Sequence, residues 1–220
     1  MIRAVLFDMD GILYDSEPVY FDIGLRVMRD LGYSGPEDCL YAGIGLTNEE
    51  TYRIYAGLLD HRVSAAEIGK RIDAYSLSRV PDYRAIMFED VPEALQILKD
   101  AGVRMACCSS SPMRVIEESL EVLGIRSFFA GIYSGENESR PKPAPDIYLR
   151  AAEGLNLKPW ECVVYEDSTL GIRAGKQAGM RVYARREERF RMDQSEADRI
   201  VSCAADMAVQ VIEENKSWKK

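Results

Sequence analysis

The sequence predicts an α/β protein with a parallel sheet and a helical insertion after the first strand. Short apolar runs typical of buried strands alternate with segments of helical period, which favours parallel strands joined by crossover helices. The apolar runs are residues 2–7, 103–108, 162–165 and 180–184. After the first run the pattern changes, and the amphipathic helices expected at 16–31, 48–59 and 65–79 have no strand among them.

The helices that cover the sheet are expected at 91–101, 112–123, 145–155 and 168–178. Several are followed by a glycine, Gly102, Gly124 or Gly179, as helix C-termini commonly are. A weak strand at 199–202 precedes a last helix near 206–214, and we interpret 185–198 as a charged surface loop or short helix. We therefore expect a Rossmann-like parallel sheet with helices on both faces. The helical insertion would lie above the carboxyl ends of the strands, where such sheets bind ligands, and would form a lid.

Length and charge narrow the class of protein. The chain has 220 residues, enough for one large domain or for a medium domain with a small one. Its formal net charge is -8 and dense basic runs are missing before the last few residues, which disfavours nucleic acid as a partner. Apolar runs are far shorter than the ~20 residues of a membrane span, so a membrane partner is not expected. The 5 cysteines lack C-x-x-C spacing, and we interpret them as reduced core residues of a cytoplasmic protein.

Two carboxylates follow the first apolar run, Asp8 directly and Asp10 just before Gly11. An Asp-Gly turn at the end of a strand explains this segment without any chemistry. In the functional interpretation, Asp8 attacks phosphorus to form an acyl phosphate, while Asp10 protonates the leaving alkoxide and later deprotonates water. That reaction needs Asp8 ionised and Asp10 protonated, so their surroundings must separate the two pKa values. A magnesium ion held by Asp8 would help to do so.

Three serines, Ser109, Ser110 and Ser111, follow the second apolar run and should face the same edge of the sheet as Asp8. Ser111 before Pro112 is typical of a helix start, and we interpret its hydroxyl as an N-cap. Capping does not explain Ser109, and a hydroxyl at a helix N-terminus is suited to hold a phosphate oxygen. Ser109 and Ser110 are therefore candidate phosphate-binding residues.

One lysine, Lys142, lies among three prolines that restrict the backbone on both sides of it. A lysine in a loop is commonly only solvated. A rigidly held ammonium also suits a site where negative charge develops on a transferring phosphoryl group. Taken alone, this segment leaves both interpretations open.

Adjacent acids, Glu166 and Asp167, end the third apolar run. Asp167 or Ser168 can cap the following helix, which is compatible with a further role. Hard oxygen ligands near Asp8 would complete a magnesium site, so Asp8, Asp10, Glu166 and Asp167 are the candidate metal ligands. The four signals occur in one order, each at a strand end or in the loop beyond it, and chance agreement of all four is improbable.

With these residues the chain resembles the haloacid dehalogenase-like hydrolase superfamily, in the branch that contains β-phosphoglucomutase and small sugar-phosphate phosphatases. The likeness covers nearly the whole chain and rests on Asp8-Met9-Asp10-Gly11, on Ser109, on Lys142 within residues 140–146, and on Glu166-Asp167-Ser168 followed by Gly171-Ile172. As a set these motifs are highly specific.

The resemblance implies a role for each matched residue. Asp8 would be the nucleophile and Asp10 the general acid and base. Ser109 would bind the phosphate, and Lys142 would bridge the phosphate and the nucleophile. Magnesium would be held by Asp8, the Asp10 carbonyl and Asp167, with Glu166 as a helper or a further ligand.

The resemblance also implies two domains, a core of residues 1–15 and 85–220 and a helical cap of residues 16–84 that closes over the substrate. A monomer is the default expectation for a capped enzyme of this size.

Cap residues bear on the choice between a phosphatase and a mutase. In the related mutases a cap histidine, an arginine and a lysine serve acid control, distal phosphate binding and sugar orientation, and this chain has Tyr20, Asn48 and Arg71 at those places. An amide at Asn48 replaces neither the charge nor the two-pronged geometry of an arginine. Residues 15–18 also look more like the phosphatases. Candidate specificity residues are Ser16, Glu17, Tyr20, Asn48 and Arg71. The only histidine, His61, is interpreted as a surface residue.

We therefore predict a magnesium-dependent phosphatase that hydrolyses a small phosphorylated metabolite, a sugar or polyol phosphate, through an aspartyl-phosphate. The first alternative is a mutase of the β-phosphoglucomutase type, in which a sugar hydroxyl takes the phosphate instead of water. The alternative from another class is a signalling receiver domain or a protein that binds a phosphorylated ligand without turnover. A receiver domain lacks a helical insertion after its first strand and does not need an acid at Asp10.

Overall fold

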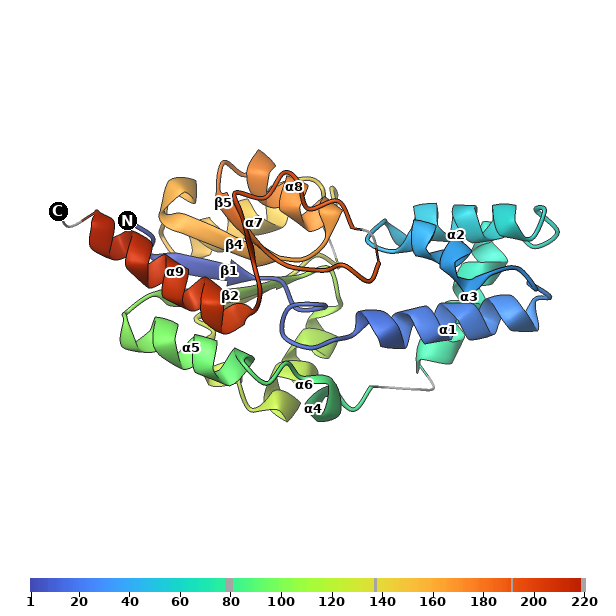
Figure 1. Cartoon of the computed structure of the whole chain (residues 1–220), viewed down its shortest axis with the longest axis horizontal. Helices are drawn as coiled ribbons and strands as arrows, with labels where there is room; N and C mark the ends of the chain where they lie inside the picture. Colours follow the sequence, from blue (N-terminus) through green and yellow to red (C-terminus); the bar gives the residue numbers. More distant parts are fainter. Residues whose placement is uncertain (78–80, 137, 191, 219–220) are drawn as a thin grey trace. The chain divides into compact units, whose positions relative to one another are not determined.

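The computed structural model describes residues 1–77, 81–136, 138–190 and 192–218. The chain forms two compact units, of which the first contains Met1–Asp15, Tyr83–Glu187 and Asp193–Lys220. The second contains Ser16–Asp82 and Glu188–Met192. We call them the sheet unit and the helical unit (Figure 1). None of the helices in the described part of the chain is long and apolar enough to span a membrane.

Within the described residues, the sheet unit contains a parallel sheet of 6 strands in the order β3-β2-β1-β4-β5-β6. Its strands are β1 Ala4–Phe7, β2 Arg104–Ser109, β3 Gly131–Ser134, β4 Cys162–Glu166, β5 Arg181–Arg185 and β6 Arg199–Val201. This order is that of a Rossmann-like sheet, as predicted, whereas receiver domains use the order 2-1-3-4-5. The receiver alternative is therefore wrong. The sequence pattern did not predict β3, which is a strand of only 4 residues at the sheet edge and is mostly half-buried.

Helices cover both faces of the sheet (Figure 1). One face packs against α5 Val91–Asp100, α6 Met113–Leu123 and α9 Ala204–Ser217. The other packs against α7 Asp146–Gly154 and α8 Thr169–Gln177. The sheet unit also contains α4 Tyr83–Ile86 and the short helices η2 Arg126–Phe128 and η3 Pro159–Glu161. Because side chains alternate along a strand, Val5 and Phe7 enter the first core while Ala4 and Leu6 enter the second.

Strand register brings distant acids together at one edge of this sheet. Phe7 of β1 is paired with Tyr165 of β4, and the Asp8 N–H donates to the Tyr165 carbonyl at 2.9 Å. The residues that follow, Asp8 and Glu166, therefore leave neighbouring strands side by side. Strands β2 and β3 lie on one side of β1, and β4 to β6 lie on the other side. The switch point between β1 and β4 is where open α/β sheets bind their ligands.

The helical unit contains α1 Glu17–Asp30, η1 Glu37–Gly43, α2 Asn48–Leu58 and α3 Ala65–Leu77. Its core includes Met28, Leu40, Tyr55 and Ile68. A capping box at Thr47, whose side chain accepts from the Glu50 N–H, fixes the start of α2. The predicted helix at 65–79 is confirmed to residue 77, and its last two positions lie outside the described residues.

The segment 185–198 is not simply the surface loop that its charges predicted. Phe190 is only 7% exposed and packs in the helical unit against the rings of Phe21 and Tyr41. Gln194 is also 7% exposed and lies in the sheet unit. A single buried ring among charged neighbours gives no periodic signal, so the sequence pattern hid this packing.

Candidate active site

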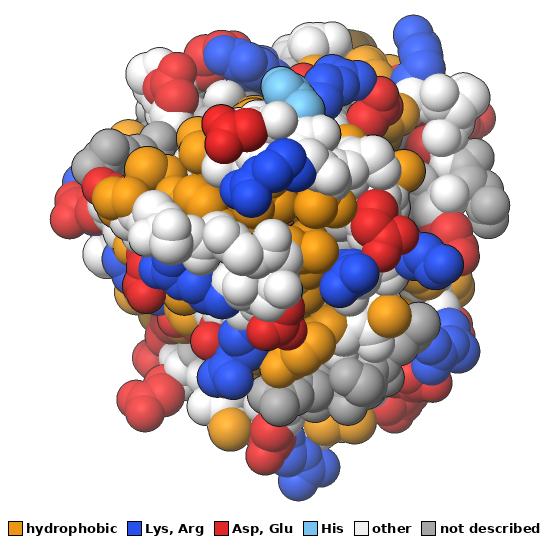
Figure 2. All heavy atoms as spheres, turned by 90° about the vertical axis from the view of Figure 1, so that its right-hand side faces the viewer, with side chains coloured by type: hydrophobic (Ala, Val, Ile, Leu, Met, Phe, Trp, Pro, Cys, Tyr) orange, Lys and Arg blue, Asp and Glu red, His pale blue; other side chains and the backbone are white. Residues whose placement is uncertain are grey.

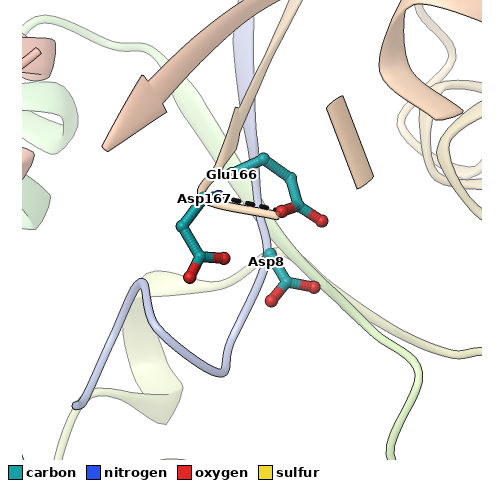
Figure 3. Close-up of side chains that lie close together, drawn as sticks. All are labelled: Asp8, Glu166 and Asp167. Carbon is teal, nitrogen blue, oxygen red and sulfur yellow. Dashed lines mark hydrogen bonds between the residues drawn. The ribbon is translucent and has the colours of Figure 1, made fainter. Parts of the chain in front are cut away.

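Three carboxylates from two strand ends form a buried cluster. One oxygen from each of Asp8, Glu166 and Asp167 lies within 4.8 Å of the others. The three residues are 8%, 1% and 3% exposed respectively. Figure 3 shows them together at the ends of β1 and β4, with the Asp167 N–H donating to the Glu166 carboxylate. Two sequence motifs separated by more than 150 residues therefore meet in one site.

Gly11 allows Asp167 to approach the first motif closely. Its φ of +70° lies in the left-handed region, and a Cβ at this position would overlap the Asp167 carboxylate. Gly171 in the first turns of α8 has the same importance for Glu166, because a Cβ there would overlap the Glu166 carboxylate. The glycines of both motifs thus make room for the acids.

Lys142 lies inside the carboxylate cluster. Its ammonium donates to Asp8 Oδ1 at 2.5 Å, to Glu166 Oε1 at 2.8 Å and to the Cys108 carbonyl at 3.3 Å. The side chain is 8% exposed, and its ammonium lies 4.9 Å from the centre of the Tyr148 ring. This lysine is a buried ion-paired group and not a solvated loop residue.

Glu166 is held by hydrogen bonds at both of its oxygens. Oε1 accepts from Lys142 and from the Tyr148 hydroxyl at 3.2 Å. Oε2 accepts from the Asp167 N–H, the Ser168 N–H and the Ser168 hydroxyl at 2.9 to 3.0 Å. With both oxygens engaged by the protein, the Glu166 carboxylate orients Lys142 in this arrangement.

Burial and neighbouring charges shift the pKa values in this cluster in different directions. Burial raises the pKa of Asp8 to about 7; the ammonium of Lys142 opposes this shift and the charge of Glu166 adds to it. Burial alone would raise the pKa of Glu166, but Lys142 and the backbone N–H groups hold it below its usual value. Burial would lower the pKa of Lys142, yet the two carboxylates raise it well above its usual value.

The donor set fits a divalent cation. Three carboxylates and one ammonium leave a formal surplus of two negative charges in a buried site. Carboxylate oxygens are the ligands that magnesium prefers. The charge and the chemistry of Asp8 and Asp167 therefore suit a magnesium ion, which would also offset the cost of ionising Asp8.

The serine loop after β2 lies beside the first motif. The buried Ser109 accepts from the Ser111 N–H at 3.1 Å, and Ser110 is exposed. The interpretation of Ser111 as a helix cap is wrong, because α6 begins after Pro112 and makes no side-chain cap hydrogen bond. Instead the Ser111 hydroxyl lies 3.4 Å from Asp10 Oδ2. The predicted cap at Ser168 is confirmed, since its hydroxyl accepts from the Gly171 N–H.

Two site residues were missed by sequence analysis. Tyr148 contacts both Lys142 and Glu166, but the sequence predicted only the helix that contains it and not this contact. Gln194 donates to the Asp167 carbonyl at 2.7 Å and to the Arg185 carbonyl at 2.6 Å. An isolated glutamine in a charged segment gives no local signal for this contact.

The five specificity candidates belong to the helical unit. Ser16 is buried, Glu17 is half-buried, Tyr20 is 40% exposed, and Asn48 is exposed at the start of α2. Arg71 is paired with Glu67 one helical turn away at 2.8 Å and lines a pocket with Val27, Asp30, Ala74 and Tyr75. His61 is exposed, as predicted, and Figure 2 shows the histidine on the surface. The five cysteines are free thiols.

The strand order and the buried acid–lysine cluster at the sheet reversal are those of an α/β protein with a candidate active site at the carboxyl edge of a parallel sheet. Residues 5–185 match the family model of the haloacid dehalogenase-like hydrolases. The chain belongs to this family, as its motifs predicted.

Curated relatives support the phosphatase group of the family. The chain is 35% identical to a phosphorylated carbohydrates phosphatase of Thermotoga maritima over 83% of this chain and 84% of that protein. It is 34% identical to hexitol phosphatase B of Escherichia coli, over 82% of each chain. The chain is thus a haloacid dehalogenase-like enzyme of the phosphatase type.

Solved structures share the fold. The β-phosphoglucomutase of Clostridium difficile has a TM-score of 0.77 at 21% identity, covering 100% of both chains. A variant of CbbY from Rhodobacter sphaeroides in complex with xylulose-(1,5)bisphosphate has a TM-score of 0.71 at 25% identity, covering 94% of this chain and 96% of that chain.

Proposed function

We propose that this enzyme hydrolyses a small phosphorylated sugar or polyol through an acyl phosphate on the Asp8 carboxylate, with magnesium bound. The observation that carries the proposal is the buried contact of Lys142 with Asp8 beside Asp167 at the switch point of the sheet. The cluster thus brings a candidate nucleophile, a buried ammonium and candidate metal ligands together in one place.

In the first half of the proposed reaction, an Asp8 oxygen attacks phosphorus and the bond from phosphorus to the sugar oxygen breaks. Asp10 gives its proton to that leaving oxygen, so the products are a neutral alcohol and an acyl phosphate. The Ser109 hydroxyl and Lys142 hold the phosphoryl oxygens and offset their negative charge.

In the second half, Asp10 takes a proton from water as the water oxygen attacks phosphorus. The bond from phosphorus to the Asp8 oxygen breaks, which releases inorganic phosphate and restores the Asp8 carboxylate. We also propose that the helical unit, with Ser16, Glu17, Tyr20, Asn48 and Arg71, is the cap that selects the substrate and excludes bulk water.

Magnesium would be held by carboxylate oxygens of Asp8 and Asp167 and by the Asp10 carbonyl. When bound, it supplies Lewis-acid stabilisation of charge on the phosphoryl group. We assign Glu166 to orienting Lys142 because its oxygens already accept hydrogen bonds from Lys142, Tyr148 and the start of α8.

Magnesium affinity is expected to fall as the pH drops below about 7. The pKa of Asp8 is raised from 3.8 to about 7 in the folded protein, so below pH 7 the cation has to displace a proton from this carboxyl. The half-saturating magnesium concentration should rise roughly tenfold per pH unit below 7 and level off above it. Titration calorimetry between pH 5.5 and 8.5 would measure this, with proton release seen only on the acid side. Equal affinity over that range would contradict the proposed ligand role of Asp8.

Hydrolysis is favoured over mutase chemistry by two observations. Two relatives, at 35% and 34% identity, are named as phosphatases of phosphorylated carbohydrates and of hexitols. At the place of the mutase arginine, Asn48 starts α2 with an exposed amide, which cannot grip a second phosphate as a guanidinium does.

The direct test is phosphate release from a panel of hexitol phosphates, hexose phosphates and glycerol phosphates, with and without magnesium. We expect release from at least one phosphorylated sugar or polyol that stops when the metal is chelated. Conversion of glucose 1-phosphate to glucose 6-phosphate without net phosphate release would favour the mutase alternative. No reaction with any member of the panel would contradict both.

A further inference from the structure

The hydroxyl of Ser111 has no capping role in this structure. The helix that follows, α6, begins at Met113, and its N-cap residue is Pro112. A serine before a proline normally accepts from the first N–H groups of a helix, and at this position no such hydrogen bond is made. The side chain is therefore available for a different contact.

The backbone of Ser111 is fixed on both sides by buried hydroxyls. Its N–H donates to Ser109 Oγ at 3.1 Å, and its carbonyl accepts from Ser134 Oγ at 2.7 Å. Ser109 is 1% exposed and Ser134 is 9% exposed. Because both partners are held at strand ends, Ser111 cannot move independently of the loop that carries the candidate phosphate-binding hydroxyl.

From this fixed position the side chain reaches Asp10. The Ser111 hydroxyl donates to Asp10 Oδ2 at 3.4 Å across 101 residues of sequence. The contact follows from strand pairing, since Phe7 of β1 is paired with Cys107 of β2 and the loops after these residues run side by side. Contacts of this length in a ligand-free site commonly shorten when substrate binds.

We propose that Ser111 is a positioning residue for Asp10. Its hydroxyl holds the Asp10 carboxyl group in line with the oxygen that leaves the substrate. This inference rests on the proposed function. A hydroxyl both donates and accepts hydrogen bonds, so the contact persists when Asp10 passes its proton to the leaving oxygen and when it receives one from water. Through the bond from Ser111 N–H to Ser109, the same loop sets the distance between the proton donor and the bound phosphate.

The competing explanation is that Ser111 only ties two loops together. The two differ in their dependence on the leaving group. An alkoxide leaves as a strong base and needs the proton from Asp10, whereas p-nitrophenolate is a weak base and leaves without one. Loss of positioning should therefore slow hydrolysis of an alkyl phosphate more than that of p-nitrophenyl phosphate, while a loosened loop should slow both alike.

The experiment compares kcat/KM, which reports the steps up to departure of the leaving group, for p-nitrophenyl phosphate and for the best hexitol phosphate of the panel. For Ser111→Ala we expect the hexitol phosphate value to fall roughly tenfold more than the p-nitrophenyl phosphate value, part of the ~10² to 10⁴ that acid–base catalysis contributes. Ser111→Thr keeps the hydroxyl and should restore most of the loss. Ser127→Ala, an exposed serine in η2 before β3, is the matched control and should change neither value.

Asp10→Asn supplies the reference. If Ser111 acts through Asp10, discrimination is set by Asp10 alone. The ratio of kcat/KM for p-nitrophenyl phosphate to kcat/KM for the hexitol phosphate should then be no larger in the double variant, with both Ser111→Ala and Asp10→Asn, than in Asp10→Asn. An equal loss on both substrates, no loss, or greater discrimination in the double variant than in Asp10→Asn would overturn the positioning role. Absence of activity of the unmodified enzyme toward p-nitrophenyl phosphate and toward every member of the panel would instead overturn the proposed function, and this inference with it.

Discussion

Replacing Asp8 by Asn is expected to reduce phosphate release by at least about 10⁴-fold, the scale of loss when a covalent nucleophile is removed. An amide oxygen is a poor nucleophile toward phosphorus and cannot form the acyl phosphate. The substitution is nearly isosteric, so the hydrogen bond from the backbone N–H of residue 8 to the Tyr165 carbonyl and the neighbouring packing remain. The loss should therefore appear in kcat without unfolding of the protein.

Phosphate release under magnesium saturation would measure this effect, together with acid quenching of the enzyme after mixing with labelled substrate. The unmodified enzyme should retain label that hydroxylamine removes, as expected for an acyl phosphate, and Asp8→Asn should retain none. Asp100→Asn, which alters an exposed carboxylate at the end of α5, should keep full activity and labelling. Turnover by Asp8→Asn within tenfold of the unmodified enzyme would exclude Asp8 as nucleophile.

Replacing Lys142 by Met should damage both catalysis and folding. The Lys142 ammonium contacts Asp8 and Glu166, so its removal leaves two buried carboxylates without the positive charge that they share. Removing one partner of a buried ion pair costs about 3–5 kcal/mol of stability. We expect activity to fall by roughly 10² to 10³-fold, as when a preorganised charge-stabilising group is lost.

The stability loss should depend on pH in a defined direction. Without Lys142, the pKa of Asp8 in the folded protein rises further above that of the unfolded chain, because the opposing charge is gone. The pKa of Glu166, which Lys142 helps to hold below its usual value, rises as well, because burial is then opposed only by its remaining hydrogen bonds. A carboxyl with a raised folded pKa destabilises the protein as the pH rises through that value. The difference in unfolding free energy between the metal-free Lys142→Met variant and the metal-free unmodified protein should therefore be largest at pH 8 and shrink toward pH 5.

Urea unfolding at both pH values with a chelator present would measure this difference. Lys176→Met is the matched control, since Lys176 is paired at the surface with Asp198 at 2.6 Å and should contribute less than about 1 kcal/mol. A loss for Lys142→Met that is equal at pH 5 and pH 8 would mean that the ammonium does not compensate the two carboxylates.

Local patterns predicted much of the fold and several of the site residues. Apolar runs marked four strands, and the residues directly after them, Asp8, Ser109 and Glu166, lie where the end of a strand places them. The edge strand β3 was not predicted because it has only 4 residues and is mostly half-buried. Phe190 escaped because its partners, Phe21 and Tyr41, belong to a distant segment.

The sequence predicted the positions of the site side chains better than it predicted their contacts. The sequence predicted Ser111 as a helix cap. In the structure Pro112 is the N-cap residue of α6, no side chain caps this helix, and the Ser111 hydroxyl contacts Asp10. The sequence predicted Glu166 as a helper or a further metal ligand, and the structure adds that its oxygens accept hydrogen bonds from Lys142 and from the start of α8. Asp10 lies 101 residues from Ser111, and Lys142 lies 24 residues from Glu166, so neither contact is visible in the local sequence.

The sequence by itself determined the parallel α/β class and the strand ends at which the acids lie, because apolar periodicity and turn chemistry are encoded among neighbouring residues. Only the tertiary structure decided that a single buried ammonium joins Asp8 to Glu166 and that Ser111 reaches Asp10. Those contacts span 134 residues from Lys142 to Asp8 and 101 residues from Ser111 to Asp10. They arise from the order and register of parallel strands, which no local stretch of sequence specifies.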